Sequence, residues 1–337
     1  MPHLPQPRGP IGDRLFEALR RDPGDLAAIA FESEAPLADE DLQLSLYVCF
    51  ELAYRGFDEV DPRWEWAPSL IALRGELEAQ FESALCDAIG PPRDGPPDPG
   101  EMDVALRSIA ESDDGPSLSQ YVERDATADQ IREFLIHRSA YQLKEADPHT
   151  WAIPRLHGPP KAAIVEVQAD EYGGGRPERI HAQLFADAMG ALGLDAEYGA
   201  YLDRIPGVTL ATVNLMSLFG LHRRLIGAIV GHLALFEMTS SIPNRRYGDG
   251  LRRLGFDGAA TEFFDEHVLA DAVHENIAAV DLAGGLARQR PELAPQITWG
   301  ARALTFCEAR WTTHLLEAWG AGRSSLLPER AAEAVTS

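Results

Sequence analysis

Residues 262–276 read Glu-Phe-Phe-Asp-Glu-His-Val-Leu-Ala-Asp-Ala-Val-His-Glu-Asn and place His267, Asp271 and His274 at positions i, i+4 and i+7. At about 100° per residue, a helix brings these three side chains within roughly 60° of one another on one face. Two imidazoles and one carboxylate suit a metal of intermediate softness, such as iron, manganese or zinc. The alternative is a solvated polar stripe that contains two unrelated histidines. The stretch therefore predicts a helix with a candidate metal-binding face.

Apolar residues recur at three- and four-residue steps through most of the chain, which is the spacing of amphipathic helices. We find no alternating strand pattern and no internal repeat, so the sequence predicts an all-α protein with stacked or bundled helices. Pro243 should end one long helix, and a basic turn should follow over residues 244–250. The predicted helices cover residues 37–57, 63–89, 126–146, 159–173, 176–193, 207–241, 259–276 and 293–320.

Composition excludes several classes of function. The chain has 337 residues, 45% of them hydrophobic, and a net charge of −23, so we expect no nucleic-acid or anionic-membrane partner. Three cysteines without paired spacing argue against a disulfide framework and a cysteine zinc site. The longest apolar run, residues 225–238, contains His232 and Glu237 and is too short to span a bilayer. We therefore expect a cytoplasmic protein with no membrane segment.

Carboxylates occur where the surrounding sequence disfavours them. Glu237 lies in the most apolar helix, where an unpaired buried carboxylate is costly unless it is neutralised, paired or bound to a cation. Its alternative partner is Arg245 or Arg246. Glu145 and Glu171 lie near the C-terminal ends of their helices, where the helix dipole disfavours an anion. A bound cation would compensate all three.

Histidines complete the set of candidate metal ligands. His181 lies early in its helix between Ile180 and Phe185, and a hydrogen-bonded core residue is the alternative to a ligand. His232 should face away from the site as a core histidine. The carboxylates and histidines together come from five consecutive helical segments, which is the inventory of a dinuclear iron or manganese carboxylate site. The familiar paired Glu-x-x-His signature occurs once, at Glu178 to His181, without a second copy.

This pattern resembles the haem-oxygenase-like diiron oxidases and oxygenases, also known as iron-containing redox enzymes. The spacing is most similar to the members that oxygenate amino-acid nitrogens, whose ligands run Glu, Glu, His, Glu and then His-x-x-x-Asp-x-x-His. Glu166 or Glu178 could stand in place of Glu171. In that family the first carboxylate helps to hold a peroxo state. The positions that match are Glu145, Glu171, His181, Glu237, His267, Asp271 and His274.

The resemblance implies a seven-helix core that binds two iron ions, with manganese as a possible substitute, and uses O2 as co-substrate. We assign this core to residues 101–325, an additional N-terminal helical region to residues 1–100 as cover or a dimerisation surface, and a flexible tail to residues 326–337. Residues 90–100 hold five prolines and predict a linker. An external electron donor would return the irons to the ferrous state, and a homodimer is possible.

The expected reaction is N-oxygenation of a small amine or amino acid through a peroxo-diiron intermediate. Arg245 and Arg246 are the nearest basic candidates to hold a substrate carboxylate, although both could instead cap the preceding helix. Tyr172, beside Glu171, is the other candidate substrate residue. Desaturation or cleavage of an amino acid or fatty acid is the enzymatic alternative. A non-catalytic iron-binding protein and a structural helical scaffold with an internal salt-bridge network are the alternatives from other classes.

Overall fold

The computed structural model describes residues 1–26, 31–93, 96, 98–112 and 114–329, and the side chains of residues 271–273 lie outside that description. Within these ranges the chain forms helices and no strand, which confirms the all-α class. The α-helices are α1 (Pro10–Leu19), α2 (Glu40–Glu51), α3 (Pro68–Ile89), α4 (Met102–Glu111), α5 (Leu118–Arg124), α6 (Ala128–Gln142), α7 (Asp147–Thr150), α8 (Gly158–Glu171), α9 (His181–Ala191), α10 (Gly207–Leu221), α11 (Ile226–Arg253), α12 (Ala259–Asn276), α13 (Gly284–Gln289) and α14 (Ala294–Gly320).

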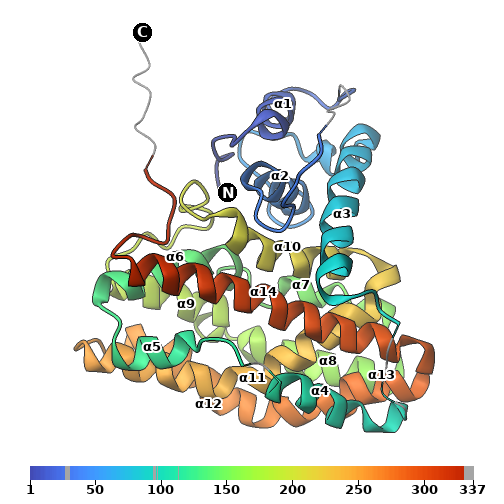
Figure 1. Ribbon diagram of the computed structural model, residues 1–337, viewed down its shortest axis with the longest axis vertical. Helices are drawn as coiled ribbons and strands as arrows, with labels where there is room; N and C mark the ends of the chain where they lie inside the picture. The colour runs from blue at the N-terminus through green and yellow to red at the C-terminus, as the bar shows by residue number, and fades with distance from the viewer. Residues whose placement is uncertain (27–30, 94–95, 97, 113, 330–337) are drawn as a thin grey trace.

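Helix α11 is the centre of the arrangement, packed against both α12 and α14. In Figure 1, α14 crosses the front of the molecule, and α11 and α12 run beneath it. Backbones of α11 and α14 come into direct contact because both carry glycine at their crossing. An added Cβ at Gly231 would overlap the Ile297 carbonyl, and one at Gly300 would overlap the Ala228 carbonyl. These two glycines therefore set how closely the two helices approach.

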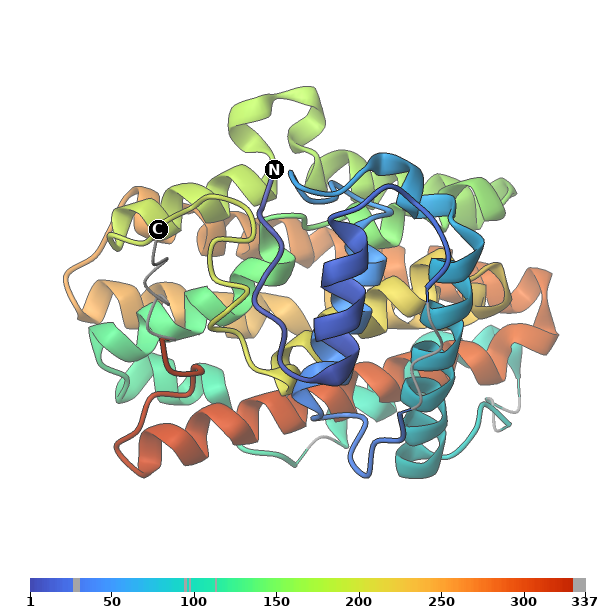
Figure 2. The same ribbon diagram turned by 90° about the horizontal axis from the view of Figure 1, so that it is seen from above.

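The N-terminal helices share an apolar core with the rest of the chain. Phe16 of α1, Phe50 of α2 and Phe81 of α3 belong to the same buried cluster as Phe219 of α10 and Leu304 of α14. Figure 1 shows α1, α2 and α3 at one end of the molecule above α10, and Figure 2 shows them from above, lying over the long helices. Helices α1, α2 and α3 thus cover one side of the helical core.

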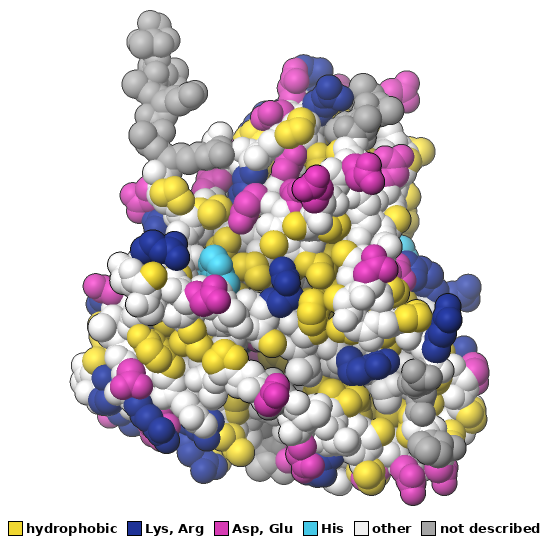
Figure 3. All heavy atoms as spheres, in the orientation of Figure 1, with side chains coloured by type: hydrophobic (Ala, Val, Ile, Leu, Met, Phe, Trp, Pro, Cys, Tyr) yellow, Lys and Arg dark blue, Asp and Glu magenta, His cyan; other side chains and the backbone are white. Residues whose placement is uncertain are grey.

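One segment within the described ranges, Arg223–Arg253, is long and apolar enough to cross a membrane by length and composition. Its apolar window is 67% buried inside the protein, which is the behaviour of a core helix. On the outer face seen in Figure 3, Lys and Arg side chains are interspersed with Asp and Glu, and apolar side chains lie between them.

The structure corrects the predicted course of residues 207–250. The predicted single helix is two helices, because residues 222–225 leave the α-helical conformation between α10 and α11. Pro243 does not end α11; it lies inside the helix, which runs on to Arg253. An internal proline costs roughly 3 kcal/mol, and packing beyond it offsets that cost. Tyr247 packs on Phe134 and Phe264, and Gly250 lies against the Val122 backbone.

Two further boundaries matter for the site. Helix α6 ends at Gln142 rather than residue 146, so Glu145 lies in a turn. Helix α9 begins at His181 rather than residue 176. At the other end of the chain, Leu326 is buried and the Leu327 N–H donates to the Arg204 carbonyl, so the start of the predicted tail is packed. Residues 330–337 lie outside the description.

Candidate metal centre

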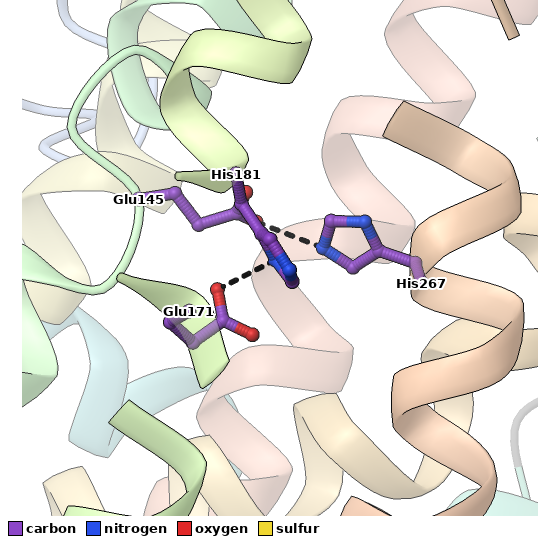
Figure 4. Close-up of side chains that lie close together, drawn as sticks. All are labelled: Glu145, Glu171, His181 and His267. Atoms are coloured by element: carbon purple, nitrogen blue, oxygen red, sulfur yellow. Dashed lines mark ion pairs between the residues drawn. The ribbon is translucent and has the colours of Figure 1, made fainter. Parts of the chain in front are cut away.

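Four predicted ligands from four segments meet in one buried cluster. Glu145 comes from the turn after α6, Glu171 from the last residue of α8, His181 from the first residue of α9, and His267 from α12. All four are buried, and one ligand atom from each lies within 4.8 Å of the others. Figure 4 shows the two imidazoles and two carboxylates pointing toward one another between the helices.

A second buried cluster joins the first through Glu171. Glu171, Glu237 of α11 and His274 of α12 also bring their ligand atoms within 4.8 Å of one another. Two groups of ligands that share a carboxylate are the arrangement required for two neighbouring cations with one bridging ligand. Six of the seven predicted positions thus come together in space.

Distances within the two clusters are those of close contacts rather than a closed hydrogen-bond network. His181 Nδ1 lies 3.0 Å from Glu171 Oε2, His267 Nε2 lies 3.6 Å from Glu145 Oε1, and His274 Nδ1 lies 3.3 Å from Glu237 Oε2. Glu145 Oε2, His181 Nδ1 and His274 Nδ1 are buried atoms with no aligned hydrogen-bond partner. Buried polar atoms are rarely left in this state, so the donor set fits a cation better than it fits itself.

Outer hydrogen bonds turn two of the imidazoles toward the clusters. His267 Nδ1 lies 2.8 Å from the Phe263 carbonyl and must donate to it, which directs Nε2 toward Glu145. His274 Nε2 lies 3.0 Å from Asp170 Oδ2 and donates to it, which directs Nδ1 toward Glu237. A metal-ligating histidine commonly uses its second nitrogen in this way.

The electrostatics of the ligand side chains favour bound positive charge. Burial alone would raise the pKa of Glu171, but the adjacent His181 imidazole lowers it to about 2. Burial opposes the charged form of His274, yet its contact with Glu237 raises the pKa to about 9. Burial raises the pKa of Glu145 above its ordinary value. The pocket therefore favours positive charge, which a metal cation would supply.

Asp271 is the seventh predicted ligand, and Glu166 and Glu178 are the alternatives to Glu171. Asp271 belongs to α12, between His267 and His274, but its side chain lies outside the described residues, so its role stays a prediction. Glu166 and Glu178, the alternatives to Glu171, are both exposed on the surface. Their exposure leaves Glu171 as the carboxylate that joins the clusters.

His232 is the core histidine that the sequence predicts. It is buried, lies 3.1 Å from the His149 ring through their nitrogens, and stacks on Phe236. Burial lowers the pKa of both histidines, to about 4 for His149, so both imidazoles are neutral at neutral pH.

A cavity of about 370 Å³ opens next to the first cluster and is lined by both Glu145 and His267. Its walls are aromatic, with Phe134, Phe185, Phe236, Tyr247 and Phe264 among them. A volume of this size is typical of small-molecule sites.

The cavity also contains polar groups that sequence reasoning missed. Arg138 of α6 and Glu308 of α14 form a two-fold ion pair in its wall, with N–O distances of 2.9 and 2.7 Å. The Arg138 guanidinium lies over the Trp311 ring at 3.9 Å. Arg138, Gln142 and Glu145 all line the cavity and follow one another at four- and three-residue steps, a spacing that was visible in the sequence.

The residues predicted to bind substrate do not line this cavity. Arg245 is exposed, and Arg246 lies near Ser119 and Glu123 at 3.3 and 3.9 Å. Neither arginine lines the cavity. The Tyr172 hydroxyl donates to Asp147 Oδ1 at 2.8 Å and lies 2.9 Å from the Thr150 hydroxyl.

Comparison with protein families gives one finding. The family model described as iron-containing redox enzyme matches residues 132–309, just over half of the chain. The match confirms the haem-oxygenase-like helical fold expected from the sequence and contains all the buried ligands described above. No curated protein matches the chain.

Proposed function

The chain belongs to the family of iron-containing redox enzymes, and on that premise we propose that it is an O2-dependent non-haem diiron oxidoreductase that oxygenates a nitrogen of a small amine or amino acid. The observation that carries the proposal is the pair of buried ligand clusters that share Glu171. A single mononuclear site would leave the second cluster without a purpose.

Two ferrous ions, when bound, would supply O2 binding and the electrons for its reduction. Glu145, His181 and His267 would hold one ion, Glu237 and His274 the other, and Glu171 belongs to both groups, with Asp271 as a further predicted ligand. Turnover then requires two reducing equivalents from an external donor. The outer hydrogen bonds to Phe263 and Asp170 keep the two imidazoles in the tautomers that direct their other nitrogens inward.

The adjoining cavity supports a catalytic role over iron binding alone. Since Glu145 and His267 line it, a molecule in the cavity would lie directly beside the first ion. The aromatic walls would exclude water from an apolar substrate body. Arg138 would bind a substrate carboxylate through its guanidinium, and Glu308 would bind an ammonium group. The pairing of Arg138 with Glu308 uses two of the five guanidinium N–H donors, so donors remain for a substrate carboxylate.

Removal of hydrogen from the same substrate, or its cleavage, is the alternative reaction. The test is anaerobic loading with Fe2+, admission of O2, and mass spectrometry of products from a panel of amines and amino acids. We expect substrate-dependent O2 consumption and a product that has gained one oxygen atom. A product that has lost two hydrogen atoms would support desaturation instead. Iron oxidation that no panel member accelerates would contradict the proposed activity.

A further inference from the structure

The turn that carries Glu145 is held from outside the region that the family model matches. Residues 143–146 join α6 to α7 without continuing either helix, so helix geometry does not fix their orientation. Ala146 has φ +73°, and within the described residues it is the one non-glycine with positive φ. A conformation of this kind is strained for alanine and persists only where the surrounding contacts impose it.

Helix α2 supplies those contacts on one side of the turn. Lys144 Nζ donates to Glu51 Oε2 at 2.7 Å, and the two side chains are 1% and 0% exposed. The Arg55 guanidinium, just beyond the end of α2, donates to the Leu143 carbonyl at 2.9 Å. On the other side, the Gln168 amide donates to the Ala146 carbonyl at 3.1 Å.

The buried pair is itself fixed in place. The Tyr198 hydroxyl donates to the same Glu51 oxygen at 2.7 Å, and Lys144 Nζ lies 4.3 Å from the centre of the Tyr54 ring. Because desolvation offsets much of the attraction, replacing a buried ion pair by apolar residues of similar size often leaves stability unchanged. Its stability contribution therefore does not account for this pair, whereas a requirement for one conformation of the turn does.

Lys144 and Glu145 are consecutive residues that reach opposite neighbours. Lys144 reaches Glu51 of α2, and Glu145 reaches His267 of α12. Any rotation of the turn that released Lys144 from Glu51 would also move the Glu145 carboxylate. We propose that Glu51 and Arg55 are positioning residues, which act through Lys144 and Leu143 to hold Glu145 in the first metal cluster. This inference rests on the proposed diiron function and gives the N-terminal region a role at the site.

The test is an anaerobic titration of the full chain with Fe2+, in which calorimetry measures the affinity for each ion. The double variant Glu51→Leu/Lys144→Met removes the charges and keeps apolar bulk. Since Glu145 belongs to the first cluster alone, we expect one of the two ions to bind about 10–100-fold more weakly. The other ion, held by Glu237 and His274, should bind as in the wild type.

A second variant tests the positioning role while leaving the buried Glu51–Lys144 pair in place. Arg55 is exposed, so Arg55→Met should fold normally and weaken the same single ion, whereas Arg55→Lys keeps a cationic donor for the Leu143 carbonyl and should restore it. Arg74→Met/Glu78→Leu is the control, because it removes the Arg74–Glu78 ion pair of α3 and the contact of Glu78 with His222, none of which involves the turn, and it should leave both ions unchanged.

The outcomes separate the two proposals. Unchanged affinity for both ions in Arg55→Met and in the double variant would overturn the positioning role and leave the diiron function standing. Equal weakening of both ions would also overturn it, because the effect would not act through Glu145. A wild-type chain that bound no iron would overturn the diiron function, and this inference with it.

Discussion

The close crossing of α11 and α14 allows a prediction about Gly231. In Gly231→Ala, the new methyl group would overlap the Ile297 carbonyl oxygen and lie 2.7 Å from its carbon. Ordinary carbon contacts begin near 3.5 Å, so the helices must separate by about 1 Å. The opposing atoms are backbone, so no rotamer change can relieve the overlap.

Overpacking of this kind costs about 1–3 kcal/mol, and we expect the upper end of that range because the contact is with backbone. Alanine regains about 1 kcal/mol over glycine as a helix former. The net expectation is a loss of about 2 kcal/mol in the free energy of unfolding, measured by chemical denaturation of the metal-free protein. Gly231 lies six residues before Glu237, so the same shift should weaken the ion in the second cluster.

Gly75→Ala is the control, since Gly75 lies in α3 with no atom within 4 Å of an added Cβ. It should stabilise the protein by about 0.5–1 kcal/mol. A Gly231→Ala variant as stable as the wild type would refute the reasoning, because it would mean that the two helices can separate without cost.

Three further predictions concern single side chains. Burial lowers the pKa of His137 well below 6.5, so the unfolded chain gains a proton that the folded chain does not; stability should therefore fall as pH drops below about 6.5, by up to ~1.4 kcal/mol per pH unit, and less steeply in His137→Gln. The free energy of unfolding is measured by chemical denaturation between pH 7 and 5, and an identical pH slope in both proteins would contradict this. Arg138→Gln should raise the KM for a carboxylate-bearing substrate at least ~10-fold with unchanged iron content, and an unchanged KM would remove Arg138 from the substrate site. Ala146→Val should destabilise the protein by about 1–3 kcal/mol because a β-branched residue tolerates positive φ poorly, whereas Ala146→Gly should be nearly neutral in the same denaturation assay; equal stability of the two variants would argue against the strained turn.

The sequence was most informative where one helix carries several chemical groups. The spacing of His267 and His274 predicted the inward face of α12. The apolar surroundings of Glu237 predicted that its carboxylate is neutralised, paired or bound to a cation. All three side chains are buried in the clusters. The extents of α8 and α14 were also predicted closely, for α8 because Pro159 and the glycines from Gly173 mark its two ends.

Features that depend on packing between distant segments could not be predicted in this way. Local propensity placed a helix end at Pro243, but contacts of Tyr247 and Gly250 with other helices carry α11 through it. The ion pair of Arg138 with Glu308 joins residues 170 positions apart, so neither residue alone indicated a binding site. Neither did local sequence indicate that Glu51 contacts Lys144, since the two lie on separate segments.

The central claim is that two cations share Glu171. Anaerobic titration with Fe2+ tests it most directly, with Glu171→Gln compared with Glu237→Gln. We predict two ions in the wild type, weaker binding of both in Glu171→Gln, and weaker binding of one in Glu237→Gln. A wild-type chain that binds a single ion, or a Glu171→Gln variant that binds two with unchanged affinity, would contradict the account.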